Sequence, residues 1–128
     1  GLKRRSWPSS KRTSMVNPYK LTTEYANQLG PQAFQRLATL CLRHFGGGTI
    51  HIADFLISLY NARFARPDLY MLCRRLDDNE FEDVMVVMRW FRDAAGRIDI
   101  HSIYGDAGDS LMHDLMDYYG KLPQGHVP

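Results

Sequence analysis

Apolar residues recur at helical spacing along most of the chain, and this periodicity predicts an all-helical protein. The clearest stretch is Ile50–Ala62, where apolar residues cover well over half of the helical wheel. A helix that is apolar on so much of its surface is expected to be surrounded by others. We therefore expect an all-α fold, a compact bundle of about five helices around this central buried helix.

Further segments with the same periodicity supply the surrounding helices. They are Thr23–Leu29 (short), Pro31–Phe45, Leu69–Leu76, Asn79–Ala95 and Asp109–Tyr119. Asp68 and either Asp77 or Asp78 are the expected N-caps of two of them. The inward positions expected on the two middle helices are Leu69, Leu72, Cys73, Leu76, Phe81, Val84, Met85, Met88, Phe91 and Ala95. Residues 97–105 are expected to form an extended or single-turn connector.

Three glycines, Gly46, Gly47 and Gly48, precede the central helix. No Gly-Lys-Ser/Thr follows them, so they do not match a phosphate-binding loop. We expect a tight turn in which glycine supplies a positive φ, with Thr49 as the N-cap of the helix that follows.

The ends of the chain differ in composition from its middle. Residues 1–18 are rich in Ser, Pro, Lys and Arg and are expected to be a disordered basic tail, followed by a single helical domain over 19–122 and a flexible C-terminus over 123–128. One interpretation of the tail is a nucleic-acid arm, with an aromatic ring for stacking on bases. Its residues would be Lys3, Arg4, Arg5, Trp7, Lys11 and Arg12. The alternatives are a solvated tail or a segment that is partly appended, for which Met15 is a candidate native start.

The net charge of +2 conceals a strong asymmetry along the chain. Residues 1–16 carry five bases and no acid, whereas residues 77–119 carry eleven acids and three bases. This pattern excludes a uniformly basic nucleic-acid binder. No apolar run approaches the roughly 20 residues that span a membrane. Cys41 and Cys73 lie within apolar helical patterns and are expected to be buried free thiols, which indicates a reducing, cytoplasmic location.

Four short words carry a resemblance to a known family: ADFLISLYNA at Ala53–Ala62, AFQRL at Ala33–Leu37, DLYML at Asp68–Leu72 and IYG at Ile103–Gly105. The chain resembles, over roughly residues 33–119, a small uncharacterised bacterial family often carried on plasmids and integrated mobile elements. Family members tend to carry Gly-Gln-Ser before the central helix and Trp before its Asn, where this chain has Gly47-Gly48-Thr49 and Tyr60. The resemblance implies a bacterial cytoplasmic protein from accessory DNA, and no activity or site.

Two polar groups near the central helix contain residue types used in catalysis or metal binding. His51, Asp54 and Ser58 form its polar strip, but a triad needs the His between the other two. The expected role is the exposed edge of the helix. Cys41, His44, His51 and Cys73 could be imagined as a zinc site, yet Cys73 has no closely spaced second ligand. We therefore expect no metal there.

A second His/Asp cluster lies near the C-terminus. The candidate metal or proton-transfer residues are His101, Asp106, Asp109, His113 and Asp117. The alternative is that the last three are simply the solvated face of an amphipathic helix.

The acidic C-terminal half offers a surface for a protein partner. Val86 and Trp90 form a second apolar stripe beside Glu82 and Asp83. Such a stripe either anchors a partner or packs under residues 97–105.

The sequence favours a non-enzymatic protein-binding or adaptor module without a cofactor, for which a homodimer is one candidate assembly. One alternative is a nucleic-acid-associated accessory protein that acts through its tail. The other is a metal-dependent enzyme that uses the cluster at residues 99–117.

Overall fold

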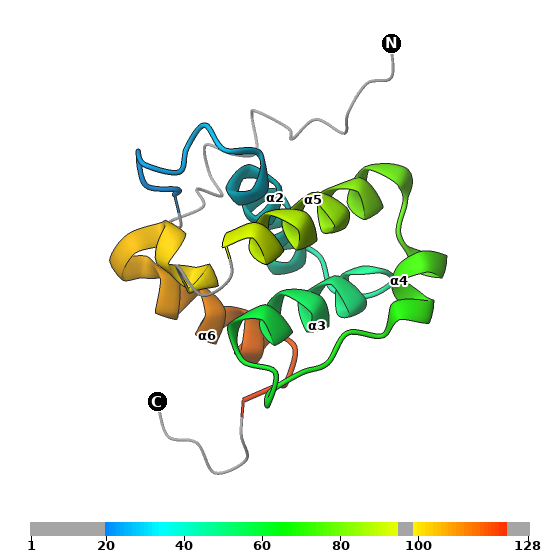
Figure 1. Ribbon diagram of the computed structural model, residues 1–128. Helices are drawn as coiled ribbons and strands as arrows, with labels where there is room; N and C mark the ends of the chain where they lie inside the picture. The colour runs from blue at the N-terminus through cyan, green and yellow to red at the C-terminus, as the bar shows by residue number, and fades with distance from the viewer. Residues whose placement is uncertain (1–19, 95–98, 123–128) are drawn as a thin grey trace.

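The computed structural model describes residues 20–94 and 99–122, and within these ranges the chain forms helices and no strands (Figure 1). The elements are α2 (Leu29–Arg43), α3 (Thr49–Tyr60), α4 (Leu69–Arg75), α5 (Asp78–Ala94), the 3-10 helix η1 (Ile100–Ala107) and α6 (Gly108–Tyr118). The predicted all-α class is confirmed. None of the described helices combines the length and apolar character needed to cross a membrane.

Helices α2 and α3 lie at the centre of the arrangement. Helix α2 contacts α3, α5 and α6, while α3 contacts α2, α4, α6 and η1. The side chains of Ile52, Leu56 and Ile57 on α3 are fully buried, as the wheel of this helix predicts. They meet Phe34 and Leu37 of α2, and the C-terminal elements complete one core with Ile100, Ile103, Leu111, Met112, Leu115 and Met116.

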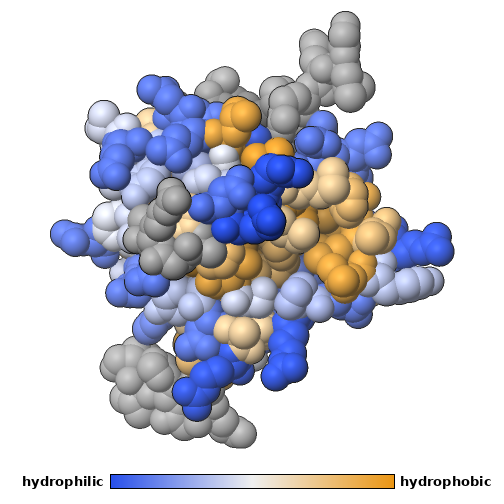
Figure 2. All heavy atoms as spheres, viewed as in Figure 1, coloured by the Kyte–Doolittle hydropathy of each residue, from blue (hydrophilic) through white to orange (hydrophobic). Residues whose placement is uncertain are grey.

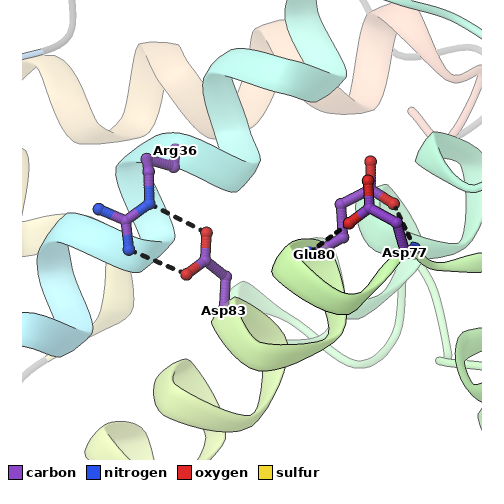
Figure 3. A network of polar contacts seen from close by, with 4 residues as sticks. All are labelled: Arg36, Asp77, Glu80 and Asp83. Atoms are coloured by element: carbon purple, nitrogen blue, oxygen red, sulfur yellow. Dashed lines mark hydrogen bonds and ion pairs between the residues drawn. The ribbon is translucent and has the colours of Figure 1, made fainter. Parts of the chain in front are cut away.

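The packing of α5 along α2 depends on two close contacts. Gly30 in the first turn of α2 lies against Trp90, and a Cβ at this position would overlap the Trp90 Cβ and Cγ. Two turns further along α2, Arg36 forms a bidentate ion pair with Asp83, with N–O distances of 2.9 and 3.0 Å (Figure 3). The Asp83 side chain is only 7 % exposed and that of Arg36 is 31 % exposed. Asp83 therefore faces inward, against α2.

Acidic caps start both α4 and α5. The Asp68 carboxylate accepts a hydrogen bond from the Met71 N–H, which confirms Asp68 as the N-cap of α4. Before α5, the Glu80 N–H donates to the Asp77 carboxylate at 2.7 Å and the Asp77 N–H donates to the Glu80 carboxylate at 3.0 Å (Figure 3). This reciprocal capping box identifies Asp77, one of the two predicted candidates, as the cap.

The glycine turn is confirmed, but its threonine plays a different part. Gly46 and Gly47 have φ values of +119° and +55°, a backbone conformation that residues with a side chain rarely adopt. Thr49 is the first residue of α3 instead of its N-cap, which is Gly48. The Thr49 hydroxyl donates to the Gly46 carbonyl at 2.8 Å and accepts from the Gly46 N–H at 3.0 Å, so it closes the turn.

The predicted helix over Thr23–Leu29 is wrong. Residues 23–27 form turns, in which the Tyr25 N–H donates to Thr22 O and the Gln28 N–H to Tyr25 O. The Thr22 N–H donates to the Ile103 carbonyl, so the segment is tethered to η1. Gly30 and Pro31 do not separate two helices: they lie in the first turn of α2, where the missing N–H of Pro costs nothing.

The inward faces predicted for α4 and α5 are wrong in part. On α4, Leu72 is buried, whereas Leu69 is 66 % exposed and Cys73 is also exposed. On α5 the buried positions are Asp83, Val84 and Val87, while Met85 and Met88 are 44 % and 45 % exposed. The physical reason is that Asp83, which a wheel places outside because it is charged, is paired and buried. Pairing rotates α5 and brings its methionines to the surface.

The connector predicted over residues 97–105 is a 3-10 helix in its described part, and it bends at Gly105, where φ is +64°. The C-terminal end of the domain is held by α2. The Tyr119 hydroxyl lies 2.7 Å from the Cys41 carbonyl oxygen and 2.8 Å from the His44 carbonyl oxygen, so its proton is shared by two acceptors at the end of α2.

We expect Arg36→Ala to lower the free energy of unfolding by about 3 kcal/mol, because it removes the guanidinium charge that faces the buried Asp83 carboxylate. The matched control is Asp93→Ala, since Asp93 pairs with Arg92 at the surface with side chains 59 % and 82 % exposed. That exposed pair should contribute little. Urea unfolding measures both effects. Equal losses in the two variants would contradict a stabilising role for the buried pair.

We also expect the protein to lose stability in alkaline solution. Burial raises the pKa of the Cys41 thiol and of the Tyr104 phenol well above their ordinary values. Both groups stay neutral in the folded protein, so their contribution is complete below the unfolded pKa values of about 8.5 for Cys and about 10 for Tyr. Above those values the unfolded chain releases protons first, and stability falls by up to about 1.4 kcal/mol per pH unit for each group.

The variants that check this are Cys41→Ala and Cys73→Ala, followed by urea unfolding between pH 7 and 10. Cys41→Ala should flatten the dependence between pH 8.5 and 10, whatever it does to stability at pH 7. Cys73 is exposed on α4, so Cys73→Ala should leave the slope unchanged. The explanation fails if the two variants change the slope alike.

Candidate functional site

Three elements bring Tyr60, His101 and Asp109 together near the end of α3. The Tyr60 hydroxyl donates to the Asp109 carboxylate at 3.0 Å. His101 Nε2 lies 3.4 Å from the same carboxylate oxygen, and the Tyr60 and His101 rings meet edge to face at 5.0 Å. Burial, followed by the hydrogen bond and the charge of Asp109, raises the pKa of Tyr60.

The backbone explains why these side chains meet. Gly108 at the start of α6 lies so close to the His101 carbonyl that any Cβ would overlap it. This close approach folds η1 back on α6 and places His101 beside Asp109. These two residues are among the candidates predicted from the sequence, whereas Tyr60 is not, because it falls within the apolar pattern of the central helix. The feature of the sequence that could have identified Tyr60 is its position at the end of a helix, where a tyrosine hydroxyl can reach a polar partner.

This cluster contains one carboxylate, one imidazole and one phenol. The Asp109 side chain is 68 % exposed and that of His101 is 23 % exposed. The other candidates do not join it: Asp106, His113 and Asp117 are exposed along the surface. Within the described residues no group of three or more His, Cys, Asp or Glu is placed to hold a metal. Tyr60, His101 and Asp109 therefore connect α3, η1 and α6 through one hydrogen bond and one imidazole–carboxylate contact.

The polar strip of α3 is also engaged in internal contacts. The Asp54 carboxylate pairs with Lys121 Nζ at 3.2 Å, and the Ser58 hydroxyl donates to the Phe55 carbonyl at 2.7 Å. The Lys121 contact was not foreseen from the sequence, because 67 residues separate the two partners. It holds the segment after α6 against the central helix.

The cysteines and histidines considered for zinc lie in different environments. Cys41 is buried and its Sγ lies 3.6 Å from the Thr49 carbonyl oxygen, to which it donates. Cys73 is exposed on α4, so the prediction that both thiols are buried is wrong for Cys73. His44 is exposed at the end of α2, where Phe45 stacks on the Tyr119 ring with centroids 5.1 Å apart.

The four residues proposed for a protein interface separate into two groups. Val86 and Trp90 are partly buried and pack against the core, and Asp83 is buried with Arg36. Glu82 is exposed on α5. Val86 and Trp90 therefore pack within the fold, with Trp90 lying against Gly30 of α2.

Four other large apolar side chains are exposed on the consecutive helices α4 and α5. They are Leu69 and Tyr70 on α4, which are each 66 % exposed, and Met85 and Met88 on α5. We name these four residues the α4–α5 surface. Figure 2 shows apolar residues gathered on the side of the molecule where α3, α4 and α5 face the viewer. A wheel alone could not find this surface, because it assigned both methionines to the core.

The residues proposed for a nucleic-acid arm lie outside the described part of the chain. They are Lys3, Arg4, Arg5, Trp7, Lys11 and Arg12.

Comparison with known proteins identifies a family. No curated protein and no solved structure matches the chain. The model of a family of unknown function, DUF7673, matches residues 31–119, which include every described helix from α3 to α6 and most of α2. The match spans well over half of the sequence and agrees with the stretch over which the sequence words resemble a family. The chain belongs to this family of unknown function.

Proposed function

We propose that the protein is a protein-binding module and that its partner binds the α4–α5 surface. The observation that carries this proposal is the exposure of four large apolar side chains, Leu69, Tyr70, Met85 and Met88, on two consecutive helices. Single exposed apolar residues are ordinary, but a group of them on one face is typical of an interaction site. Burying such side chains contributes favourably to association.

The chemistry of this surface suits a protein partner. Methionine is flexible and polarizable, so a pair of methionines adapts to apolar side chains of varied shape. The charges around them have both signs, with Glu82 before Met85 and Arg89 after Met88, all exposed. A surface of mixed sign does not suit a uniformly charged polymer such as nucleic acid, whereas a protein can present complementary charges of both signs.

The polar side chains offer indirect support for a binding role over a catalytic one. On α3, Asp54 pairs with Lys121 and Tyr60 donates to Asp109, while the Ser58 hydroxyl donates to the Phe55 carbonyl within the same helix. The first two contacts join α3 to the C-terminal segment and stabilise the domain that presents the α4–α5 surface.

The test is a site-specific photo-crosslink in cells that express the full chain. Met85→p-benzoylphenylalanine places the reactive group on the α4–α5 surface, and Tyr118→p-benzoylphenylalanine is the matched control. Tyr118 is 44 % exposed, the same fraction as Met85, but it lies on α6. We expect a discrete protein adduct from position 85 and none of that mass from position 118.

The proposed function is wrong if position 85 gives no protein adduct after irradiation. It is equally wrong if positions 85 and 118 give the same set of adducts, because the contact would then reflect random collision.

A further inference from the structure

We propose that the partner on the α4–α5 surface is a second copy of this chain. In this homodimer, α5 of one copy lies antiparallel to α5 of the other about a twofold axis that passes between Met85 and Met88. The proposal rests on the proposed function, since it names the occupant of the same surface.

The order of charges along the exposed face of α5 supports this arrangement. Asp78 and Glu82 precede the two methionines, whereas Arg89 and Arg92 follow them, and all four are exposed. The face therefore has an acidic end, an apolar centre and a basic end. An antiparallel copy brings the acidic end of each helix to the basic end of the other, so that attraction occurs twice. A parallel copy would place like charges together.

The spacing also fits a single axis. An α-helix rises about 1.5 Å per residue, so Glu82 lies about 7 Å from the midpoint of Met85 and Met88. On the opposite side Arg89 lies about 4 Å and Arg92 about 8 Å from that midpoint. In the antiparallel pair, Glu82 thus lies between the partner's Arg89 and the partner's Arg92, while Met85 lies beside the partner's Met88.

The exposed residues of α4 enlarge the contact. Stable protein interfaces bury about 1,200–2,000 Å² in total, which is more than two methionines on each helix supply. Leu69 and Tyr70, the first two residues of α4, supply two further large exposed side chains, and Arg74 lies over the Tyr70 ring at 5.3 Å. Because a twofold interface uses the same patch on both copies, these residues contribute twice.

The decisive experiment uses two charge-reversed forms of the full chain. One is Glu82→Arg and the other is the double variant Arg89→Glu/Arg92→Glu. In each homodimer the reversed residues would face like charges. Mixing the two forms pairs Arg with Glu on both sides of the axis, so a heterodimer is favoured.

Sedimentation velocity and light scattering measure the mass of each sample. We expect the wild type at about twice the monomer mass of 14.8 kDa. Each charge-reversed form alone should dissociate about tenfold or more readily, and the equimolar mixture should return to the dimer mass. Tyr118→Glu, which adds a charge at equal exposure on α6, should dimerise like the wild type. Circular dichroism verifies that all forms are folded, as expected for substitutions at exposed positions.

A wild type that stays monomeric at millimolar concentration would overturn the homodimer. So would dimers that persist in both charge-reversed forms, or a mixture that does not recover the dimer. These results are distinct from failure of the proposed function. If position 85 crosslinks to another protein while the wild type is monomeric, the surface binds a partner but not a second copy. An adduct of twice the chain mass supports both proposals.

Discussion

The ion pair between Arg36 and Asp83 is the contact on which the placement of α5 depends. It is bidentate, it joins two helices far apart in sequence, and the carboxylate is almost fully buried. A carboxylate in such a position must keep its partner, because an unpaired buried charge is costly. With Asp83 facing α2, position 85 points about 200° away around a helix of 3.6 residues per turn. The exposure of Met85 is thus a geometric consequence of the buried pair.

The contact between Gly30 and Trp90 fixes the same helix pair at its other end. Only glycine lets the Trp90 ring lie directly on the backbone of α2. An ion pair at one end and a steric fit at the other define both the rotation and the separation of α5. The capping box at Asp77 and Glu80 then determines where α5 begins, so its charged and apolar positions are held in a defined register.

Much of the fold could be predicted from the sequence, because helical periodicity and capping chemistry are local. The central helix, the positive φ of Gly46 and the cap at Asp68 follow from residues within a few positions of each other. The rotation of α5 could not be predicted, since it depends on an arginine 47 residues away. The turns over residues 23–27 were missed for the same reason: the Thr22 N–H bonds to Ile103, on a distant element.

The candidate sites follow the same division between local and distant contacts. His101 and Asp109, which are close along the chain, could be predicted as neighbours from the sequence, whereas Tyr60, which reaches Asp109 from α3, could not. The sequence offered Val86 and Trp90 either as a partner anchor or as packing within the fold, and they lie on a different side of α5 from the exposed Met85 and Met88. Both stripes are apolar, and nothing local distinguishes them. What distinguishes them is the partner of Asp83, because a helix that turns one carboxylate inward must turn other side chains outward. The burial of Asp83 and the exposure of Met85 and Met88 therefore have the same cause, which is the rotation of α5 set by the Arg36–Asp83 pair. The same rotation places the charged residues that flank the methionines on the exposed face of α5.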